Sequence, residues 1–202
     1  MMKIIGLTGP SGAGKGSIAS LFAAHGIPSI DADAVYRELL IPPSPCLDEL
    51  AHRFGSSILS EDGTLNRPAL AALVFAPGKE AELQALNRIS HRYVMEEMRR
   101  RLARYEAEGL PAVLVDAPQL YESGFDAECH HILAVLAPRP LRLARIMARD
   151  ALDQARAEAR LNAARPDEFF LSHADAVLVN DKELASLDRD VSELLRAWEV
   201  FP

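Results

Sequence analysis

The chain opens with a short apolar segment, a glycine-rich turn and a helical pattern, placed directly one after another. The apolar segment is Lys3–Thr8, the turn Gly9–Ser17 reads GPSGAGKGS, and the helical pattern continues from Ile18. The turn fits the pattern G-x-x-x-x-G-K through Lys15, in which backbone N–H groups and the start of the next helix converge on phosphate oxygens. The order of strand, loop and helix therefore predicts an α/β fold with a phosphate site at this turn.

Within the turn, we predict that the nucleotide is bound by six consecutive residues: Gly12, Ala13, Gly14, Lys15, Gly16 and Ser17. Lys15 supplies a positive charge for the β- and γ-phosphates. The usual pattern has Ser or Thr directly after the lysine, and this chain has Gly16 there, so we assign the magnesium-side hydroxyl to Ser17. The alternative is a plain strand, turn and helix that is merely rich in glycine.

Length, composition and charge favour a single α/β domain and argue against several other classes of protein. With 202 residues, 49% of them hydrophobic, the chain suits one α/β domain with a true core and an inserted subdomain. A net charge of −7 argues against a general nucleic-acid binder, which needs a basic face. We find no signal-like segment, no apolar stretch of the ~20 residues needed to cross a bilayer, and no C-x-x-C pair. We therefore expect a cytoplasmic protein, away from membranes, that is a monomer or a small homo-oligomer.

Apolar runs predict five strands, at residues 3–8, 27–31, 112–116, 131–136 and 175–179. A helical pattern follows each run, which is typical of a parallel, doubly wound sheet flanked by helices. This arrangement predicts a core built from residues 1–40, 110–150 and 174–202.

Two further regions interrupt this core. Residues 41–109 have a mainly helical pattern and are predicted to form a subdomain. Residues 150–173 are rich in Ala, Arg and Glu and have little to bury, which favours a mobile lid that places arginines over an anion. The alternative for this second region is a surface helical hairpin with solvated arginines.

Charged side chains at two places are candidates for function. Asp31 and Asp33 follow the second predicted strand, where open α/β sheets place their active sites. The alternative for Asp33 is a helix N-cap. Residues 99–101 are three consecutive arginines one turn after Glu96 and Glu97, so we expect a solvated, ion-paired face there, with phosphate binding as the alternative.

Beyond these patterns, the chain resembles the dephospho-coenzyme A kinase family over nearly its whole length. The motifs that carry the resemblance, in the family's order, are Ile30-Asp31-Ala32-Asp33, Asp62-Gly63-Thr64-Leu65-Asn66-Arg67, His91, Pro118-Gln119-Leu120-Tyr121-Glu122, Met147-Ala148-Arg149-Asp150, and Ala174-Asp175 with Asn180. The resemblance implies a phosphate-loop kinase core with a helical coenzyme A-binding subdomain and a lid. It also implies transfer of the γ-phosphoryl group of ATP to the 3′-hydroxyl of dephospho-coenzyme A.

Residue by residue, the resemblance implies the following roles. The catalytic groups would be Asp33, Lys15, Arg149 and Arg160, with Asp33 readying the acceptor hydroxyl. Asn180 would join the nucleotide site. The acceptor would be contacted by Asp33, Arg67, His91, Leu120 and Tyr121. Mg²⁺ would accompany ATP, close to Ser17 and Asp31.

Several positions depart from the family pattern. The turn resembles that of cytidylate and adenylate kinases, and Arg92, Ala164 and Val179 stand where the family has Pro, Gln and Asp. Two alternatives therefore remain: a nucleoside monophosphate kinase that accepts CMP or AMP, and a non-catalytic protein that only binds ATP. A GTP switch is disfavoured, because the chain has no N-K-x-D signature.

Overall fold

The computed structural model describes residues 1–201 of the chain. They divide into two compact units, one of Met1–Ile30 with the residues from Arg104 onward, and one of Asp31–Ala103. Each unit is described by itself below. No helix in the described range has the length and apolar character that crossing a membrane requires.

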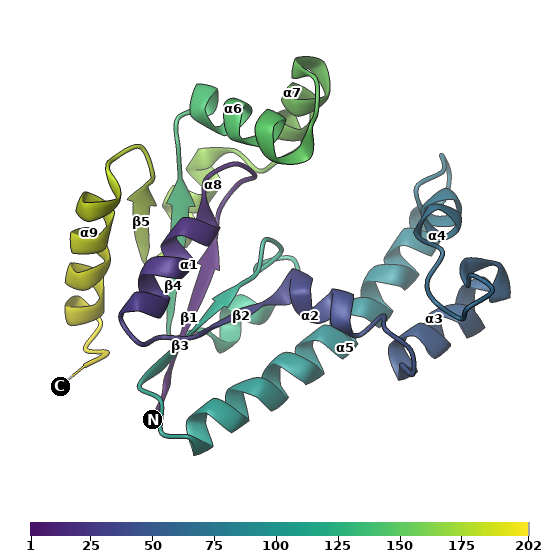
Figure 1. The fold of residues 1–202 in the computed structure, drawn as a ribbon, viewed down its shortest axis with the longest axis horizontal. Coiled ribbons are helices and arrows are strands. Elements are labelled where there is room, and N and C mark those ends of the chain that lie inside the picture. Colours follow the sequence, from purple (N-terminus) through teal and green to yellow (C-terminus); the bar gives the residue numbers. More distant parts are fainter. Residues whose placement is uncertain (202) are drawn as a thin grey trace. The chain divides into compact units, whose positions relative to one another are not determined.

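A five-stranded parallel sheet forms the centre of the first unit, as the apolar runs predict (Figure 1). Its spatial order is β2-β3-β1-β4-β5. The strands are β1 (Lys3–Thr8), β2 (Ser29–Asp31), β3 (Ala112–Asp116), β4 (His131–Leu136) and β5 (Ala176–Val179). In the parallel register, Lys3 of β1 lies opposite Ala112 of β3 and Ile5 lies opposite His131 of β4. The phosphate-loop segment therefore leaves the central strand of the sheet.

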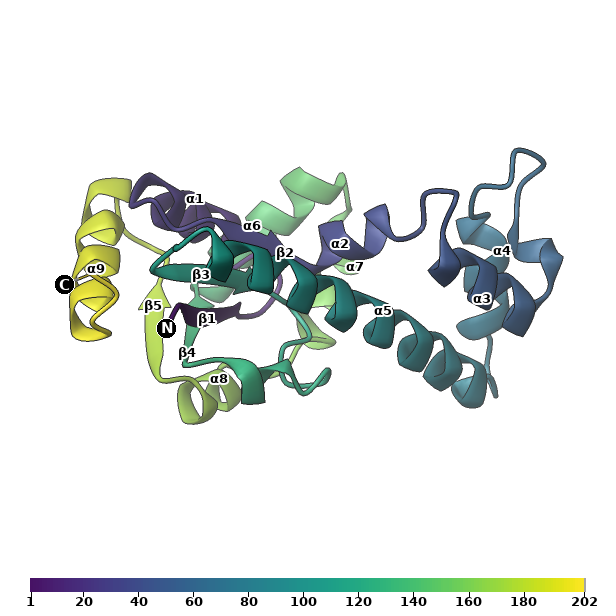
Figure 2. The same cartoon turned by 90° about the horizontal axis from the view of Figure 1, so that it is seen from below.

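Both faces of this sheet are covered, and the alternation of side chains along β4 shows how. Leu133 and Val135 join a core formed with helices α1 (Lys15–Ala24) and α9 (Leu184–Ala197). Ala134 and Leu136 point the other way and join Phe170 of α8 (Asp167–His173). Figure 2 shows α1 and α8 on opposite sides of the strands. The sheet is therefore doubly wound, in agreement with the prediction.

The connection from β3 to β4 differs from the expected pattern of a helix after every strand. It contains only η2, a 3-10 helix at Phe125–Glu128, preceded by turns. Gly124 adopts φ 74°, a left-handed conformation in which an α-helix cannot continue.

The segment predicted to be a lid buries more than its composition suggested. Three α-helices connect β4 to β5: α6 (Arg139–Asp150), α7 (Gln154–Asn162) and α8. Ala157 and Leu161 of α7 are buried against Ile146 of α6, and Phe170 of α8 packs against the sheet. Small residues such as Ala157 contribute to the contact between α6 and α7. A count of large apolar residues therefore underestimates how much of this segment is buried.

The second unit is helical, as predicted for this region. It contains α2 (Ala32–Glu38), α3 (Pro45–Phe54), η1 (Ser56–Ile58), α4 (Arg67–Val74) and most of α5 (Glu80–Ala107). Two side chains that accept hydrogen bonds from the first turn, Ser44 and Asn66, cap α3 and α4. The buried core includes Leu40, Cys46, Leu50, Ile58, Leu70 and Ile89.

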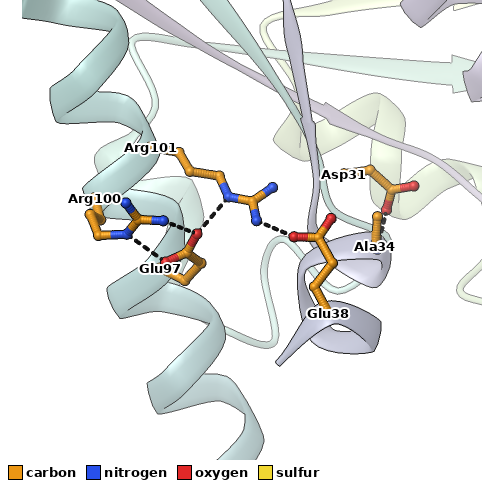
Figure 3. A network of polar contacts seen from close by, with 6 residues as sticks. All are labelled: Asp31, Ala34, Glu38, Glu97, Arg100 and Arg101. Carbon is orange, nitrogen blue, oxygen red and sulfur yellow. Dashed lines mark hydrogen bonds and ion pairs between the residues drawn. The ribbon is translucent and has the colours of Figure 1, made fainter. Parts of the chain in front are cut away.

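The arginine run on α5 forms the ion-paired face that the sequence predicts (Figure 3). Glu97 accepts hydrogen bonds from Arg100 and from Arg101, each at 2.7 Å, and Arg101 also pairs with Glu38 of α2. The hydrogen bonds from Arg100 are the main reason that the pKa of Glu97 falls to about 2. Arg100 and Arg101 are therefore engaged by carboxylates of their own unit.

Candidate active site

The glycine-rich turn has a backbone that other residues could not adopt. Gly14, the N-cap of α1, has φ 89°, and a Cβ atom there would lie 2.1 Å from Nδ2 of Asn180. A Cβ atom on Gly12 would lie 2.6 Å from the carbonyl oxygen of Arg142. Both distances are too short for any side chain, so these glycines allow the loop to pack directly on its neighbours.

Donors from distant parts of the chain hold the carbonyl groups of this loop. Nε of Arg142 donates to the oxygen of Ser11 at 3.1 Å, and Nη1 of Arg145 donates to the oxygen of Ala13 at 3.1 Å. Asn180 donates through Nδ2 to the same oxygen of Ala13 at 2.9 Å. Because the C=O and N–H groups of a trans peptide point in opposite directions, these bonds turn the next N–H groups away from the anchoring side chains. The loop is thus shaped to present amides to an anion.

Three side chains that anchor the loop, those of Asn180, Arg142 and Arg145, differ in role from what the sequence predicted. Asn180, predicted to contact the nucleotide, is buried at the back of the loop. Arg142 and Arg145 were not predicted as site residues, although their spacing from Arg149 along one helix places all three on related faces. Arg142 is also buried, and its Nη1 pairs with Asp167 at the start of α8 at 3.0 Å.

The lysine of the motif begins α1. Nζ of Lys15 donates to the carbonyl oxygen of Gly9 at 3.1 Å, so its ammonium group stays at the turn itself. Ser17, two residues later, lies exposed in the first turn of the same helix. The positive end of the helix dipole and the lysine charge favour an anion at this point.

The two arginines predicted to lie on the lid are brought together by one carboxylate. Asp150 accepts from Nε and Nη2 of Arg149 at 2.8 and 2.9 Å and from Nη1 of Arg160 at 2.7 Å. Nη2 of Arg149 also lies 3.5 Å from Oγ of Ser11, which places this cluster beside the glycine-rich turn. Hydrogen bonds from Arg149 are the main cause that lowers the pKa of Asp150.

One further carboxylate lies at the end of β3, the strand that pairs with β1 beside the glycine-rich turn. Asp116 ends β3 and is opposite Leu7 in the register of the sheet, two residues before the turn begins at Gly9. A carboxylate such as that of Asp116 and a hydroxyl such as that of Ser17 are hard oxygen donors, which Mg²⁺ prefers. The chemistry of these residues therefore fits a magnesium ion. The sequence signal for Asp116 was its position at the end of a buried apolar strand.

The aspartates predicted after the second strand belong to the helical unit and have different roles in it. Asp31, not Asp33, is the N-cap of α2, since its Oδ1 accepts from the backbone N of Ala34 at 2.9 Å (Figure 3). The capping alternative considered for Asp33 is thus wrong. Asp33 lies exposed in the first turn of the helix, with its carboxylate not used as the cap.

The predicted acceptor residues are distributed over both units. Arg67 is exposed at the start of α4, and His91 is half-buried on α5. Leu120 is fully buried, so its side chain offers no surface to a ligand in this structure and belongs to the core.

Tyr121 packs edge-on against Phe169 and His173 of α8, with ring centroids 5.1 and 5.8 Å apart. Burial raises the pKa of Tyr121 to about 12. The environment of this ring is therefore apolar, and it is provided by α8, the last part of the predicted lid.

Comparison with known proteins identifies relatives for nearly the whole chain. A protein-family model described as "Dephospho-CoA kinase" matches residues 3–186. The dephospho-CoA kinase of Anaeromyxobacter dehalogenans is 43% identical over 180 residues, covering 89% of this chain and 84% of that protein. The dephospho-CoA kinase of Bacillus thuringiensis is 36% identical over 201 residues and is covered in full, as is this chain.

Solved structures agree with this result. The protein TT1252 from Thermus thermophilus superimposes with a TM-score of 0.82 at 33% identity, covering 97% of both chains. A dephospho-CoA kinase from Campylobacter jejuni superimposes with a TM-score of 0.70 at 23% identity, covering 97% of this chain and 96% of that one, which supports the fold.

Proposed function

This chain belongs to the dephospho-CoA kinase family, and on that premise we propose which of its residues carry the transfer of the γ-phosphoryl group of ATP to the 3′-hydroxyl of dephospho-CoA. The protein is an ATP-dependent kinase. The single observation that carries the assignment of roles is the joining of the glycine-rich turn, Lys15 and the Arg149–Arg160 pair within one compact unit. Phosphoryl transfer needs positioning and neutralisation of charge more than covalent chemistry, and these groups supply both.

We assign the phosphates of ATP to the turn between β1 and α1. The amides of residues 12–17 and the start of α1 bind phosphate oxygens, and Lys15 pairs with the β- and γ-phosphates. Arg142, Arg145 and Asn180 contribute indirectly, because they hold the loop carbonyls from behind. A loop held in this way does not have to be ordered when the nucleotide arrives, which lowers the entropic cost of binding.

Arg149 and Arg160 are proposed to offset the charge of the phosphoryl group during transfer. Both side chains are about half exposed, so donors remain available to a ligand. Cationic groups aimed at the transferring phosphate commonly make a large contribution to the rate.

We propose that magnesium is held by oxygen atoms of Ser17 and Asp116, in part through water. When bound, the ion neutralises charge between the β- and γ-phosphates. Asp31 was predicted for this role. We assign it to Asp116 instead, because Asp31 already caps α2 through Oδ1 and Arg37 lies 3.7 Å from its Oδ2.

Asp33 is proposed as the group that orients the acceptor hydroxyl and receives its proton. Support comes from the family resemblance around residues 30–33. The Asp33 carboxylate is also exposed and is not used to cap α2. A positioned general base typically contributes 10²- to 10⁴-fold to a rate. Arg67, His91 and Tyr121 stay as predicted acceptor contacts, and cytoplasmic location and oligomeric state stay predictions as well.

An acceptor panel tests this proposal. The purified protein is incubated with ATP and Mg²⁺ together with dephospho-CoA, CMP or AMP, and the products are identified by phosphorus NMR. We expect a 3′-phosphate on dephospho-CoA and no comparable product from the two nucleotides. Preferential phosphorylation of CMP or AMP would favour the monophosphate kinase, and ATP binding without any product would favour the non-catalytic alternative.

Lys15→Ala provides the matching test of the phosphate loop. We expect it to weaken ATP binding and lower kcat together, since the lysine acts on the ground state and on the transition state. The control is Lys182→Ala, which removes an exposed lysine that pairs with Asp190 on α9. Equal activity of the two variants would contradict the role given to Lys15.

A further inference from the structure

We propose that Asp150 is a positioning residue that holds Arg149 and Arg160 together, so that both guanidinium groups meet the transferred phosphate as a preformed pair. The inference rests on the proposed function, because it deepens the roles given there to the two arginines. Asp150 itself would not touch the substrate.

The contacts of Asp150 join two helices. Its Oδ1 accepts from Nε of Arg149 at 2.8 Å, and its Oδ2 accepts from Nη2 of Arg149 at 2.9 Å and from Nη1 of Arg160 at 2.7 Å. Arg149 is on α6, and Arg160 comes ten residues after Asp150, on α7. A single carboxylate therefore fixes the heads of two long, flexible side chains, which otherwise lose rotamer freedom only when the ligand binds.

Of the three side chains in this cluster, that of Asp150 is the least exposed to solvent. The side chain of Asp150 is 22% exposed, whereas those of Arg149 and Arg160 are 57% and 52% exposed. A guanidinium group carries five N–H donors, and Asp150 occupies two on Arg149 and one on Arg160. The remaining donors are enough for phosphate oxygens to bind without displacing Asp150.

Local helix energetics do not account for an acid at this position. Asp150 is the last residue of α6, and the negative end of a helix dipole disfavours a carboxylate there. Ala151 then adopts φ 51° and ends the helix, and Asp153 caps α7, which runs back so that Arg160 reaches Asp150. The ion pairs offset the unfavourable helix position, and they also relieve repulsion between two neighbouring cations.

Asp150→Asn tests the proposal, because it keeps the shape and removes the charge. We expect kcat to fall on the order of 10- to 10²-fold, the scale of misplaced catalytic groups, with the KM for dephospho-CoA unchanged. Thermal unfolding should be nearly unchanged, because the variant removes the clash with the helix dipole and the partly exposed ion pairs together, and the two effects offset one another. Asp150→Ala, which also removes the acceptor atoms, is a second variant that should give at least as large a loss.

The matched control is Asp153→Asn. Asp153 lies in the same connection, and its Oδ1 accepts from the backbone N of Arg156 at 2.8 Å, a bond that asparagine can keep. We expect near-wild-type kinetics for this variant. A similar loss in both variants would mean that any change in the connection disturbs the enzyme, and it would overturn a specific role for Asp150.

A mutant cycle that combines the Asp150 and arginine substitutions separates a role in positioning the arginines from a general effect on the structure. In an Arg149→Gln/Arg160→Gln background, adding Asp150→Asn should cause no further loss of kcat, because nothing remains to be positioned. An additional loss there, wild-type activity of Asp150→Asn alone, or tighter ATP binding by it would each overturn the proposal. If instead the arginine variant itself keeps full activity, the role of the arginines in the proposed function fails.

Discussion

Nδ2 of Asn180 donates to the carbonyl oxygen of Ala13 at 2.9 Å, joining residues 167 positions apart in the chain. The same amide group is what a Cβ atom on Gly14 would strike. The segment after β5 and the glycine-rich turn are therefore fitted to one another, and the shape of the turn depends on a residue far away in sequence.

Asn180→Ala is expected to affect both stability and nucleotide binding. It leaves the buried oxygen of Ala13 with fewer donors, which should lower the free energy of unfolding by about 1–3 kcal/mol. Since the loop loses one of its anchors, the KM for ATP should rise. Denaturant unfolding and steady-state kinetics measure the two effects.

The control for this variant is Asn162→Ala. Asn162 is exposed and accepts from Arg139, so its loss should change stability by only about 0.5 kcal/mol or less. An unchanged KM for ATP in Asn180→Ala would show that this bond does not shape the loop.

Two glycines of the same turn should respond in opposite ways to alanine. Gly14→Ala places Cβ 2.1 Å from Nδ2 of Asn180 at a φ of 89°, which should cost about 1–3 kcal/mol of stability and weaken ATP binding. Gly16→Ala meets nothing within 4 Å in a helical turn, and it should raise stability by up to about 1 kcal/mol. Thermal unfolding and ATP titration compare the variants, and a larger loss in Gly16→Ala would refute this description of the turn.

The local part of the site was predictable because its signals are local. Lys15 and the glycines before it have a spacing that few other structures require, and apolar runs such as residues 112–116 mark buried strands. The anchors of the loop were not predictable. Arg142 and Ser11 are 131 residues apart, and nothing in either neighbourhood specifies that they pair.

Asp31 at the end of β2 and Asp33 just after it show a further limit on what the sequence can predict. Asp31 and Asp33 both have the chemistry of an N-cap, and the choice depends on which residue first adopts helical dihedral angles. Asp31 has φ −89° and ψ 111°, an extended conformation, so the helix begins after it and Asp33 is left exposed. Sequence patterns place helix ends only to within a few residues. Here the two candidate caps are only two positions apart, so the pattern could not decide between them.

The partly buried thiol of Cys129 predicts a loss of stability in alkali. Burial is the main cause that raises the pKa of Cys129 from its ordinary value to about 12. Well below its ordinary pKa of about 8.5, the thiol is protonated in both the folded and the unfolded chain. As pH rises further, only the unfolded chain loses the proton, so stability should fall between about pH 9 and pH 12.

Comparison of the wild type with Cys129→Ala isolates this effect from other groups that titrate in alkali. Between pH 8 and pH 10, the wild type should lose about 1 kcal/mol more than the variant, as measured by urea unfolding. Equal losses in both proteins would show that the thiol ionises in the folded state without a penalty.

In the proposed reaction, Asp33 prepares the acceptor hydroxyl while the turn at residues 9–17 holds the triphosphate. The most direct measurement is the kcat of Asp33→Asn with dephospho-CoA, alongside Asp48→Asn, which alters another exposed acid in the first turn of a helix of the same unit. We expect Asp33→Asn to lower kcat on the order of 10²- to 10⁴-fold with ATP affinity unchanged, and Asp48→Asn to match the wild type. Near-wild-type turnover by Asp33→Asn would contradict the role proposed for this carboxylate.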